Sequence, residues 1–208
     1  MSQIDLQNHL DSAGSGESIR LFKNDALETL SHVHPIVPLC IWSPLIVFLL
    51  YRSQASYHLS AFTMLGLASA AILTWTFMEY FLHRFVFHFP ARHTLTKYLV
   101  FTFHGVHHAA PQDKTRLVMP PAGAVIFLGL FWLLFEALLP DAWLGAFFAF
   151  FTVGYLIYDY IHYAIHHFPM KSPLANYLKI CHLRHHFKTP DRCFGVSSPL
   201  WDIVFRTN

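Results

Sequence analysis

Four long apolar stretches leave this chain few folds other than a bundle of membrane-spanning helices. They occupy about residues 37–51, 59–78, 122–139 and 142–158. Crossing a bilayer takes about 20 apolar residues in a helix, so the second and third stretches are long enough and the fourth is acceptable. The first is short, which leaves a half-buried or re-entrant segment as its alternative. We predict an all-α integral membrane protein with four transmembrane helices in two hairpins.

The overall composition agrees with a membrane location. Apolar residues make up 54% of the chain and charged residues only 12%, whereas an average soluble domain has about 25% charged residues. The formal net charge is only +2, so the sequence gives no case for nucleic acid as a partner.

Basic residues predict the orientation of the helices. If all four stretches cross, residues 1–35, 79–121 and 159–208 lie on one side and hold thirteen of the 14 Lys and Arg residues, leaving only Arg52 opposite. The positive-inside tendency places that side in the cytoplasm. We expect cytoplasmic termini and a cytoplasmic helical cap built from 79–121 and 159–208. The membrane would be that of the endoplasmic reticulum in a eukaryote and the inner membrane in a bacterium.

The N-terminal region differs in character from the rest. Residues 1–31 are mostly polar and include the stretch Ser12–Glu17, so we expect a mobile tail rather than a cleavable signal peptide. Residues 32–208 then form a single membrane domain.

Ten of the sixteen histidines fall into four clusters beside the apolar stretches. They are His83 and His88; His104, His107 and His108; His162 and His166; and His182, His185 and His186. Residues at i, i+3 and i+4 share one helical face, and neutral imidazole is a common ligand of transition metals. We predict that these ten residues bind metal. The isolated His9, His32, His34, His58 and His93 are expected to be structural, and His167 is open between the two roles.

The number and type of ligands narrow the metal chemistry. One zinc or iron ion uses about four to six ligands, so ten histidines suit two ions. Zinc and iron are both compatible with imidazole. A hydrolytic zinc site usually has a nearby carboxylate base, and the His-Glu-x-x-His pattern is absent. Two irons with dioxygen would oxidise an aliphatic carbon, and a lipid is the natural substrate at this depth. We expect no catalytic residue separate from the metal ligands.

Carboxylates near the clusters are candidates for orienting the ligands. Asp159 precedes His162 by three residues and Glu79 precedes His83 by four, so each is expected on the ligand face, where it would accept the second ring N–H. For both, an ordinary structural role is the alternative, and Glu79 could simply be solvated. Tyr163 is a further candidate. Asp202 is expected to tie down the C-terminal segment instead.

The three cysteines, Cys40, Cys181 and Cys193, form no Cys-x-x-Cys pair. Because two of them belong to the expected cytoplasmic cap, we predict free thiols.

The order and surroundings of the histidines resemble a known family. The order His-x4-His, His-x2-His-His, His-x2-His-His resembles the fatty acid hydroxylase, sterol oxidase and desaturase superfamily of membrane proteins. The match to its fatty acid 2-hydroxylase branch runs from about Glu79 to Thr207. It is carried by His83-Arg-Phe-Val-Phe-His88, His104-Gly-Val-His107-His108, Arg116-Leu-Val-Met-Pro-Pro121, Tyr158-Asp159-Tyr-Ile-His162-Tyr-Ala-Ile-His166-His167 and Phe194-Gly-Val-Ser-Ser-Pro-Leu-Trp-Asp-Ile-Val-Phe205.

This resemblance implies a four-helix membrane domain that holds two metal ions through the ten clustered histidines, with iron in the active form and zinc as a possible occupant. It implies hydroxylation of carbon 2 of a long-chain fatty acid, or of the N-acyl chain of a sphingolipid, with dioxygen and two electrons. Many relatives carry a cytochrome b5 domain ahead of this one, but the residues before Ser31 are too few for a haem domain. Electrons are therefore expected from a separate cytochrome b5 or ferredoxin type of protein with its reductase.

Three alternatives stay open from the sequence. The nearest is another lipid oxidase of the superfamily, acting on sterols, carotenoids or alkyl lipids. A metal transporter would place its ligands near the middle of the membrane, whereas these clusters lie at or beyond the ends of the apolar stretches. A zinc-dependent membrane hydrolase would work without oxygen or a reductant.

Overall fold

The computed structural model describes residues 18–208, and this part of the chain is helical with no strand. The polar stretch Ser12–Glu17 noted above and His9 lie outside the described residues. The elements run in the order α2 (Asp25–Ser31), α3 (Ile36–Tyr57), α4 (Ala61–Phe81), η1 (Leu82–Phe87), α5 (Thr94–Val100), η2 (Phe101–Gly105), α6 (Val106–Ala109), α7 (Pro121–Leu138), α8 (Asp141–His167), α9 (Pro173–Phe187) and α10 (Leu200–Val204). The elements η1 and η2 are π-helices.

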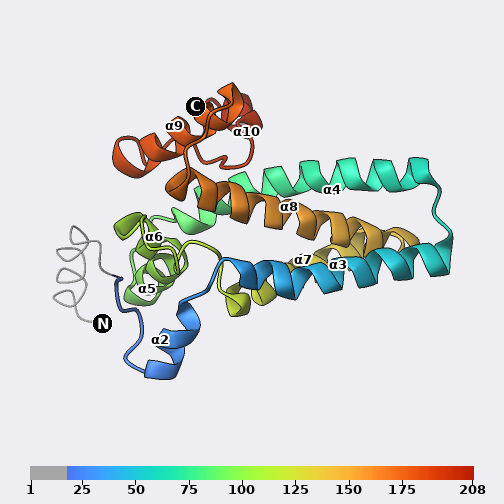
Figure 1. The fold of residues 1–208 in the computed structure, drawn as a ribbon, viewed down its shortest axis with the longest axis horizontal. Helices are drawn as coiled ribbons and strands as arrows, with labels where there is room; N and C mark the ends of the chain where they lie inside the picture. Colours follow the sequence, from blue (N-terminus) through green and yellow to red (C-terminus); the bar gives the residue numbers. More distant parts are fainter. Residues whose placement is uncertain (1–17) are drawn as a thin grey trace.

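Four helices of the described part are long and apolar enough to cross a membrane, and they form two hairpins (Figure 1). The first hairpin joins α3 to α4, and the second joins α7 to α8 through Pro140. The first apolar stretch, short in the sequence, belongs to the 22-residue helix α3. Helix α3 is longer than this apolar stretch because the polar residues after Tyr51 continue the helix as far as Tyr57. The chain is a multi-pass membrane protein.

Helix α8 lies at the centre of the bundle, with α3 and α4 packed along it. Trp75 of α4 packs edge-on against Phe151 and Tyr155 of α8, at ring-centroid distances of 5.1 and 5.6 Å. This close approach requires Gly154, since a Cβ there would lie 2.7 Å from Cβ and Cγ of Trp75. Small residues at helix contacts are how membrane bundles bring backbones together. The contact fixes α8 against α4, and both helices lead into the cap.

The remaining helices form a cap at one end of the bundle (Figure 1). Most of its residues come from 79–121 and 159–208, and α2, which precedes the first spanning helix, lies at the same end. Helix α4 continues without a break through η1 into the cap, and the C-terminal end of α8 reaches the same end of the bundle. The histidine clusters are therefore carried by extensions of two spanning helices and by the cap helices between and after them.

Residues 18–31, expected within a mobile tail, are instead folded against the cap. Asn24 caps α2 by accepting hydrogen bonds from the N–H groups of Ala26 and Leu27. Ile19 and Ser31 are buried. The cap residue and the acidic first turn of Asp25 and Glu28 are ordinary helix-start signals, so the helix was detectable from the sequence, although its docking was not.

Two of the three cysteines are paired, which corrects the prediction of free thiols. Cys181 on α9 and Cys193 form a disulfide, with their Cα atoms 5.6 Å apart. The chain after α9 turns back on the helix, and this return brings together two residues that no sequence motif links. Cys40 is free and exposed.

Candidate metal centre

The structure brings all ten clustered histidines together in two groups of five. The first group contains His83, His88, His104, His108 and His185, and the second contains His107, His162, His166, His182 and His186. Within each group, one ring nitrogen from every residue lies within 4.8 Å of the others. His32, His34, His58, His93 and His167 belong to neither group.

A π-turn places the first cluster on one face. His83 and His88 are five residues apart, which would separate their directions by about 140° on an α-helix. In η1 the N–H of His88 instead bonds to the carbonyl of His83 at 3.1 Å, and this i to i+5 bond stacks the two residues above one another. Their ring centroids are 5.0 Å apart.

Each His-x2-His-His box is divided between the two groups. His104 and His108 join the first group, while His107 between them joins the second. The second box is divided in the opposite sense, with His185 in the first group and His182 and His186 in the second. Successive residues on a helix point about 100° apart, so one turn can serve two neighbouring sites. The rings of His108 and His186 stack at 4.0 Å between the groups.

The spacing of the ring nitrogens fits a bound cation. In the second group, Nε2 of His182 lies 3.0 Å from Nε2 of His162, His166 and His186. One N–H proton cannot satisfy three such contacts, whereas neighbouring ligands at right angles around an ion with bonds of about 2.0–2.1 Å are roughly 3.0 Å apart. Both ring nitrogens of the buried His107 lack any hydrogen-bond partner. These groups can hold metal.

Burial keeps the cap histidines in the form that binds metal. Desolvation, reinforced by repulsion from His185, lowers the pKa of His88 to about 4. Burial lowers the pKa of His185 to about 4 as well. The pKa values of His104, His107 and His182 are also well below the usual range, with burial as the largest cause and neighbouring histidines next. Neutral rings offer the lone pair that a metal requires.

Backbone carbonyls, which the sequence analysis did not identify, orient two of the ligands. Nδ1 of His83 lies 2.6 Å from the carbonyl oxygen of Phe194, and Nδ1 of His185 lies 2.8 Å from that of Arg192. A carbonyl can only accept, so both rings carry hydrogen on Nδ1 and present the Nε2 lone pair to the first group. The turn at 192–194 therefore serves two ligands at once.

The two carboxylates proposed from the sequence bond to groups other than histidine. Glu79 accepts hydrogen bonds from the N–H groups of Val196 and Ser197, at 2.5 and 2.8 Å, and from the Ser197 hydroxyl. Asp159 accepts from the hydroxyl of Tyr155 at 3.0 Å and from Met119 N–H at 3.4 Å.

Tyr163 packs its ring against His167, which belongs to neither group, with centroids 4.5 Å apart. Asp202 ties down the C-terminal segment, because its carboxylate accepts hydrogen bonds from the N–H groups of Phe194 and Gly195 and from the Thr207 hydroxyl. Glu79 and Asp202 thus bond to residues 194–197, which continue directly from the carbonyl acceptors at 192 and 194, rather than to the rings themselves.

A four-helix membrane bundle capped by two polyhistidine groups defines a class of membrane metalloproteins, and sequence comparisons specify it further. A sequence model described as fatty acid hydroxylase matches residues 68–207. The chain belongs to the fatty acid hydroxylase family.

Named relatives cover most of the chain. A dihydroceramide fatty acyl 2-hydroxylase of Arabidopsis thaliana is 40% identical over 193 residues, covering 92% of this chain and 80% of the relative. A fatty acid 2-hydroxylase of Homo sapiens is 38% identical over 210 residues, covering 91% of this chain and 56% of the relative. The solved structure of full-length scs7p, in which only the hydroxylase domain is visible, matches with a TM-score of 0.82 at 38% identity, covering 87% of this chain and 69% of that one.

These relatives support a hydroxylating oxidoreductase that acts on lipids in a membrane. They favour this function over the metal transporter and the hydrolase considered from the sequence.

Proposed function

We propose that this protein hydroxylates carbon 2 of a long acyl chain, either a free fatty acid or the N-acyl group of a sphingolipid, using dioxygen and two electrons. The observation that carries the proposal is the pair of five-histidine groups at the end of a membrane bundle. The position of the hydroxyl follows from the 2-hydroxylase activity named for relatives at 38–40% identity.

We propose that each group holds one ion, with iron in the active form and zinc as a possible occupant. Bound iron would supply the activation of dioxygen. The protein's own contribution is to hold ten neutral rings in fixed directions, two of them through the carbonyls of Arg192 and Phe194. Seven of the ten side chains are buried, which limits the access of bulk water to the reacting carbon.

A cavity of about 290 Å³ beside the histidines would receive the acyl chain. Its lining includes His104 of the first group and His107 and His162 of the second. Most of the wall is apolar, and the ionisable side chains in it, Arg116 and Asp159, are already bonded to protein groups. An acyl chain in this cavity would bring a carbon near its carbonyl end close to both groups, and such positioning sets which carbon reacts.

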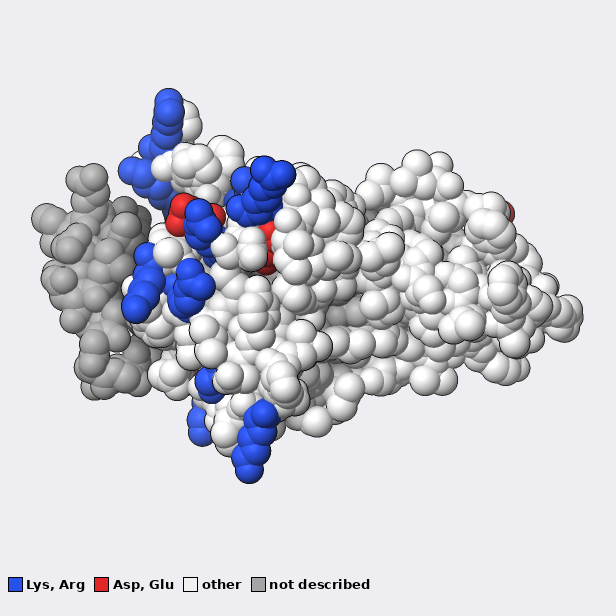
Figure 2. All heavy atoms as spheres, turned by 90° about the horizontal axis from the view of Figure 1, so that it is seen from above, with Lys and Arg blue, Asp and Glu red and all other residues white. Residues whose placement is uncertain are grey.

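The distribution of charge supports a cytoplasmic site and a separate electron donor. Figure 2 shows Lys and Arg gathered over the cap end, while the bundle beside them is nearly bare of charge. We propose that the cap lies on the cytoplasmic side of the membrane, which would be the endoplasmic reticulum membrane in a eukaryote or the inner membrane in a bacterium. Its basic surface would receive an acidic donor of the cytochrome b5 or ferredoxin type.

The test is mass spectrometry of lipids from cells expressing the intact chain, a His107→Ala variant or a His34→Ala variant. His34 is exposed and outside both groups, so it is the matched control. We expect acyl chains heavier by one oxygen atom, located next to the carbonyl carbon, with the intact chain and His34→Ala. His107→Ala should lower that product by at least about 100-fold.

Two results would contradict the proposal. A hydroxyl found on another carbon would favour a different lipid oxidase, and a lipid change that persists without oxygen would favour hydrolysis.

A further inference from the structure

The segment that precedes the first spanning helix forms one side of the cavity next to the histidines. Leu21, Phe22, Leu27 and Leu30 line this cavity together with residues of η2, α7 and α8. The matched family region begins at residue 68, so it assigns no role to residues 18–31. The sequence alone suggested a mobile tail here.

We propose that residues 18–31 are part of the acyl-binding site, where they form its outer wall and contact the acyl chain directly. This inference rests on the proposed function for the identity of the ligand. It assigns the contact to the chain of the lipid rather than to its head group, because Leu21, Phe22, Leu27 and Leu30 offer apolar side chains to the cavity.

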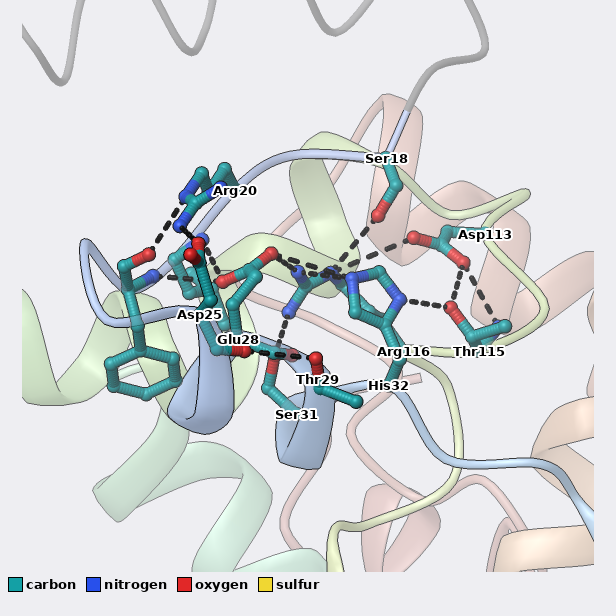
Figure 3. A network of polar contacts seen from close by, with 12 residues as sticks. Ser18, Arg20, Asp25, Glu28, Thr29, Ser31, His32, Asp113, Thr115 and Arg116 are labelled. Atoms are coloured by element: carbon teal, nitrogen blue, oxygen red, sulfur yellow. Dashed lines mark hydrogen bonds and ion pairs between the residues drawn. The ribbon is translucent and has the colours of Figure 1, made fainter.

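Arg116 attaches residues 18–31 to the rest of the cap (Figure 3). Its side chain is only 2% exposed and forms an ion pair with Glu28 of α2. The same guanidinium donates to the hydroxyls of Ser31, at 2.8 Å, and Ser18, at 3.1 Å. A buried charge needs such a set of partners, so the wall and the loop that carries Arg116 depend on one another.

Glu28 connects Arg116 to two of the residues that line the cavity. Its Oε2 accepts hydrogen bonds from the N–H groups of Leu21 and Phe22, at 2.9 and 2.8 Å, while its Oε1 faces Arg116. Burial alone would raise the pKa of Glu28, but the Phe22 N–H and the charge of Arg116 outweigh it and hold the pKa below its usual value. The carboxylate therefore stays ionised at neutral pH and joins Leu21 and Phe22 to α2 and to Arg116.

Two further bonds attach the end of the segment to the same loop. His32 Nδ1 lies 2.6 Å from the Thr115 hydroxyl oxygen, and the N–H of Val33 donates to the Thr115 carbonyl at 2.7 Å. Figure 3 shows His32 between Arg116 and Thr115. A docked segment with this many specific contacts has a fixed position relative to the cavity.

The outer edge of the wall is apolar and accessible. Leu27 and Leu30 border the cavity and are still 51% and 71% exposed, and Ile126 of α7, which also lines the cavity, is 56% exposed. The cavity volume of about 290 Å³ lies at the lower end for ligand pockets. A long acyl chain would therefore extend past these three side chains toward the bilayer, with α2 against it.

The first experiment is photo-crosslinking of the full chain in membranes, which needs no variant. The probes are a fatty acid and a ceramide, each with a diazirine midway along the acyl chain. We expect label on the peptide that contains residues 18–31, removed by excess unlabelled fatty acid. Helix α5 carries the exposed Leu95 outside the cavity, so label there measures unspecific contact with lipid.

The second experiment uses Leu27→Ala, with Leu95→Ala as the matched control. We expect the KM for a long-chain substrate to rise about 10-fold in Leu27→Ala, the low end for lost apolar contact because Leu27 is half exposed. The KM for a short-chain substrate and all values for Leu95→Ala should be unchanged. Glu28→Gln should reduce the label on residues 18–31 and leave the label on α7.

The results separate this inference from the proposed function. Label on residues 18–31 without any 2-hydroxylated product would support the wall and contradict the proposed reaction. Normal 2-hydroxylation with label equally strong on α5, or with equal KM values for Leu27→Ala and Leu95→Ala, would overturn the wall.

Discussion

Among single residues, the positions of the ligands depend on groups that do not bind metal. Phe194 supplies the carbonyl for His83, and Glu79 and Asp202 hold the turn that contains it by accepting four backbone N–H bonds. Gly195 in this turn has no room for a side chain, since a Cβ would lie 2.2 Å from the carbonyl oxygen of Ser198. Glu79, which is near His83 in sequence, thus acts one step further from the ring than its spacing suggested.

Glu79→Ala should weaken metal binding through this turn. The variant removes the acceptor of Val196 N–H, Ser197 N–H and the Ser197 hydroxyl, which should lower the free energy of unfolding by about 2–3 kcal/mol. Metal content of purified protein, measured by mass spectrometry, should fall toward one ion per chain. Glu79→Gln keeps one acceptor oxygen and should be milder. Full metal content in Glu79→Ala would show that the turn does not depend on this residue.

At the scale of elements, π-turns and close helix contacts place the clusters. The two π-helices, η1 and η2, each contain or adjoin histidines of the first group. Helix α8 carries His162 and His166 near its C-terminus, and its register against α4 is set by the contact of Gly154 with Trp75. The positions of His162 and His166 therefore depend on how α8 packs against α4, two turns or more before these histidines.

Gly154→Ala should destabilise the bundle, because its Cβ would overlap Trp75 at 2.7 Å. We expect the free energy of unfolding to fall by about 1–3 kcal/mol, the usual cost of overpacking. Gly66→Ala and Gly129→Ala are the controls, since nothing lies within 4 Å of a Cβ at either position, and both should be neutral or stabilising by up to about 1 kcal/mol. Thermal unfolding in detergent measures all three. Equal melting temperatures would argue against this contact.

The Cys181–Cys193 disulfide should stabilise the chain segment that returns along α9. Cys193→Ser should lower the free energy of unfolding by about 2–3 kcal/mol under oxidising conditions, and a reductant should abolish the difference from the unmodified chain. Cys40→Ser, at the free and exposed cysteine, should change nothing. Mass spectrometry of non-reduced peptides tests the pairing directly, and alkylation of all three cysteines without a reductant would contradict it.

The whole molecule combines a membrane bundle with a cap that is stable only while its histidines are neutral. Burial lowers the pKa of the cap histidines, to about 4 for His185 and, with added repulsion from His185, to about 4 for His88. The unfolded chain titrates near the ordinary value of about 6.5, so between these values it binds more protons than the folded chain. Stability therefore rises with pH across this window and is fully present above it.

Acid should release the metal and loosen the cap in the same range. We expect metal content to be constant above roughly pH 6.5 and to fall steeply as the pH drops toward 4, since protons compete for the same nitrogens. Dialysis at a series of pH values, followed by metal analysis and thermal unfolding, measures both effects. The bundle contains no such group of buried histidines away from the cap, so its helical circular dichroism should persist. Metal retained unchanged at pH 4 would count against these pKa shifts.

The sequence by itself determined the four spanning helices and the ten clustered histidines. Hydropathy and spacing are local properties, so the apolar stretches became α3, α4, α7 and α8, and the family followed from the same residues. Only the tertiary structure decided how the histidine boxes divide between two groups, that Cys181 meets Cys193, and that Glu79 bonds to the turn at 196–197. Only it showed that residues 18–31 dock beside the cavity. The physical reason is common to all of these: each is a contact made when separate helices pack, and the pattern of one segment does not contain the position of another.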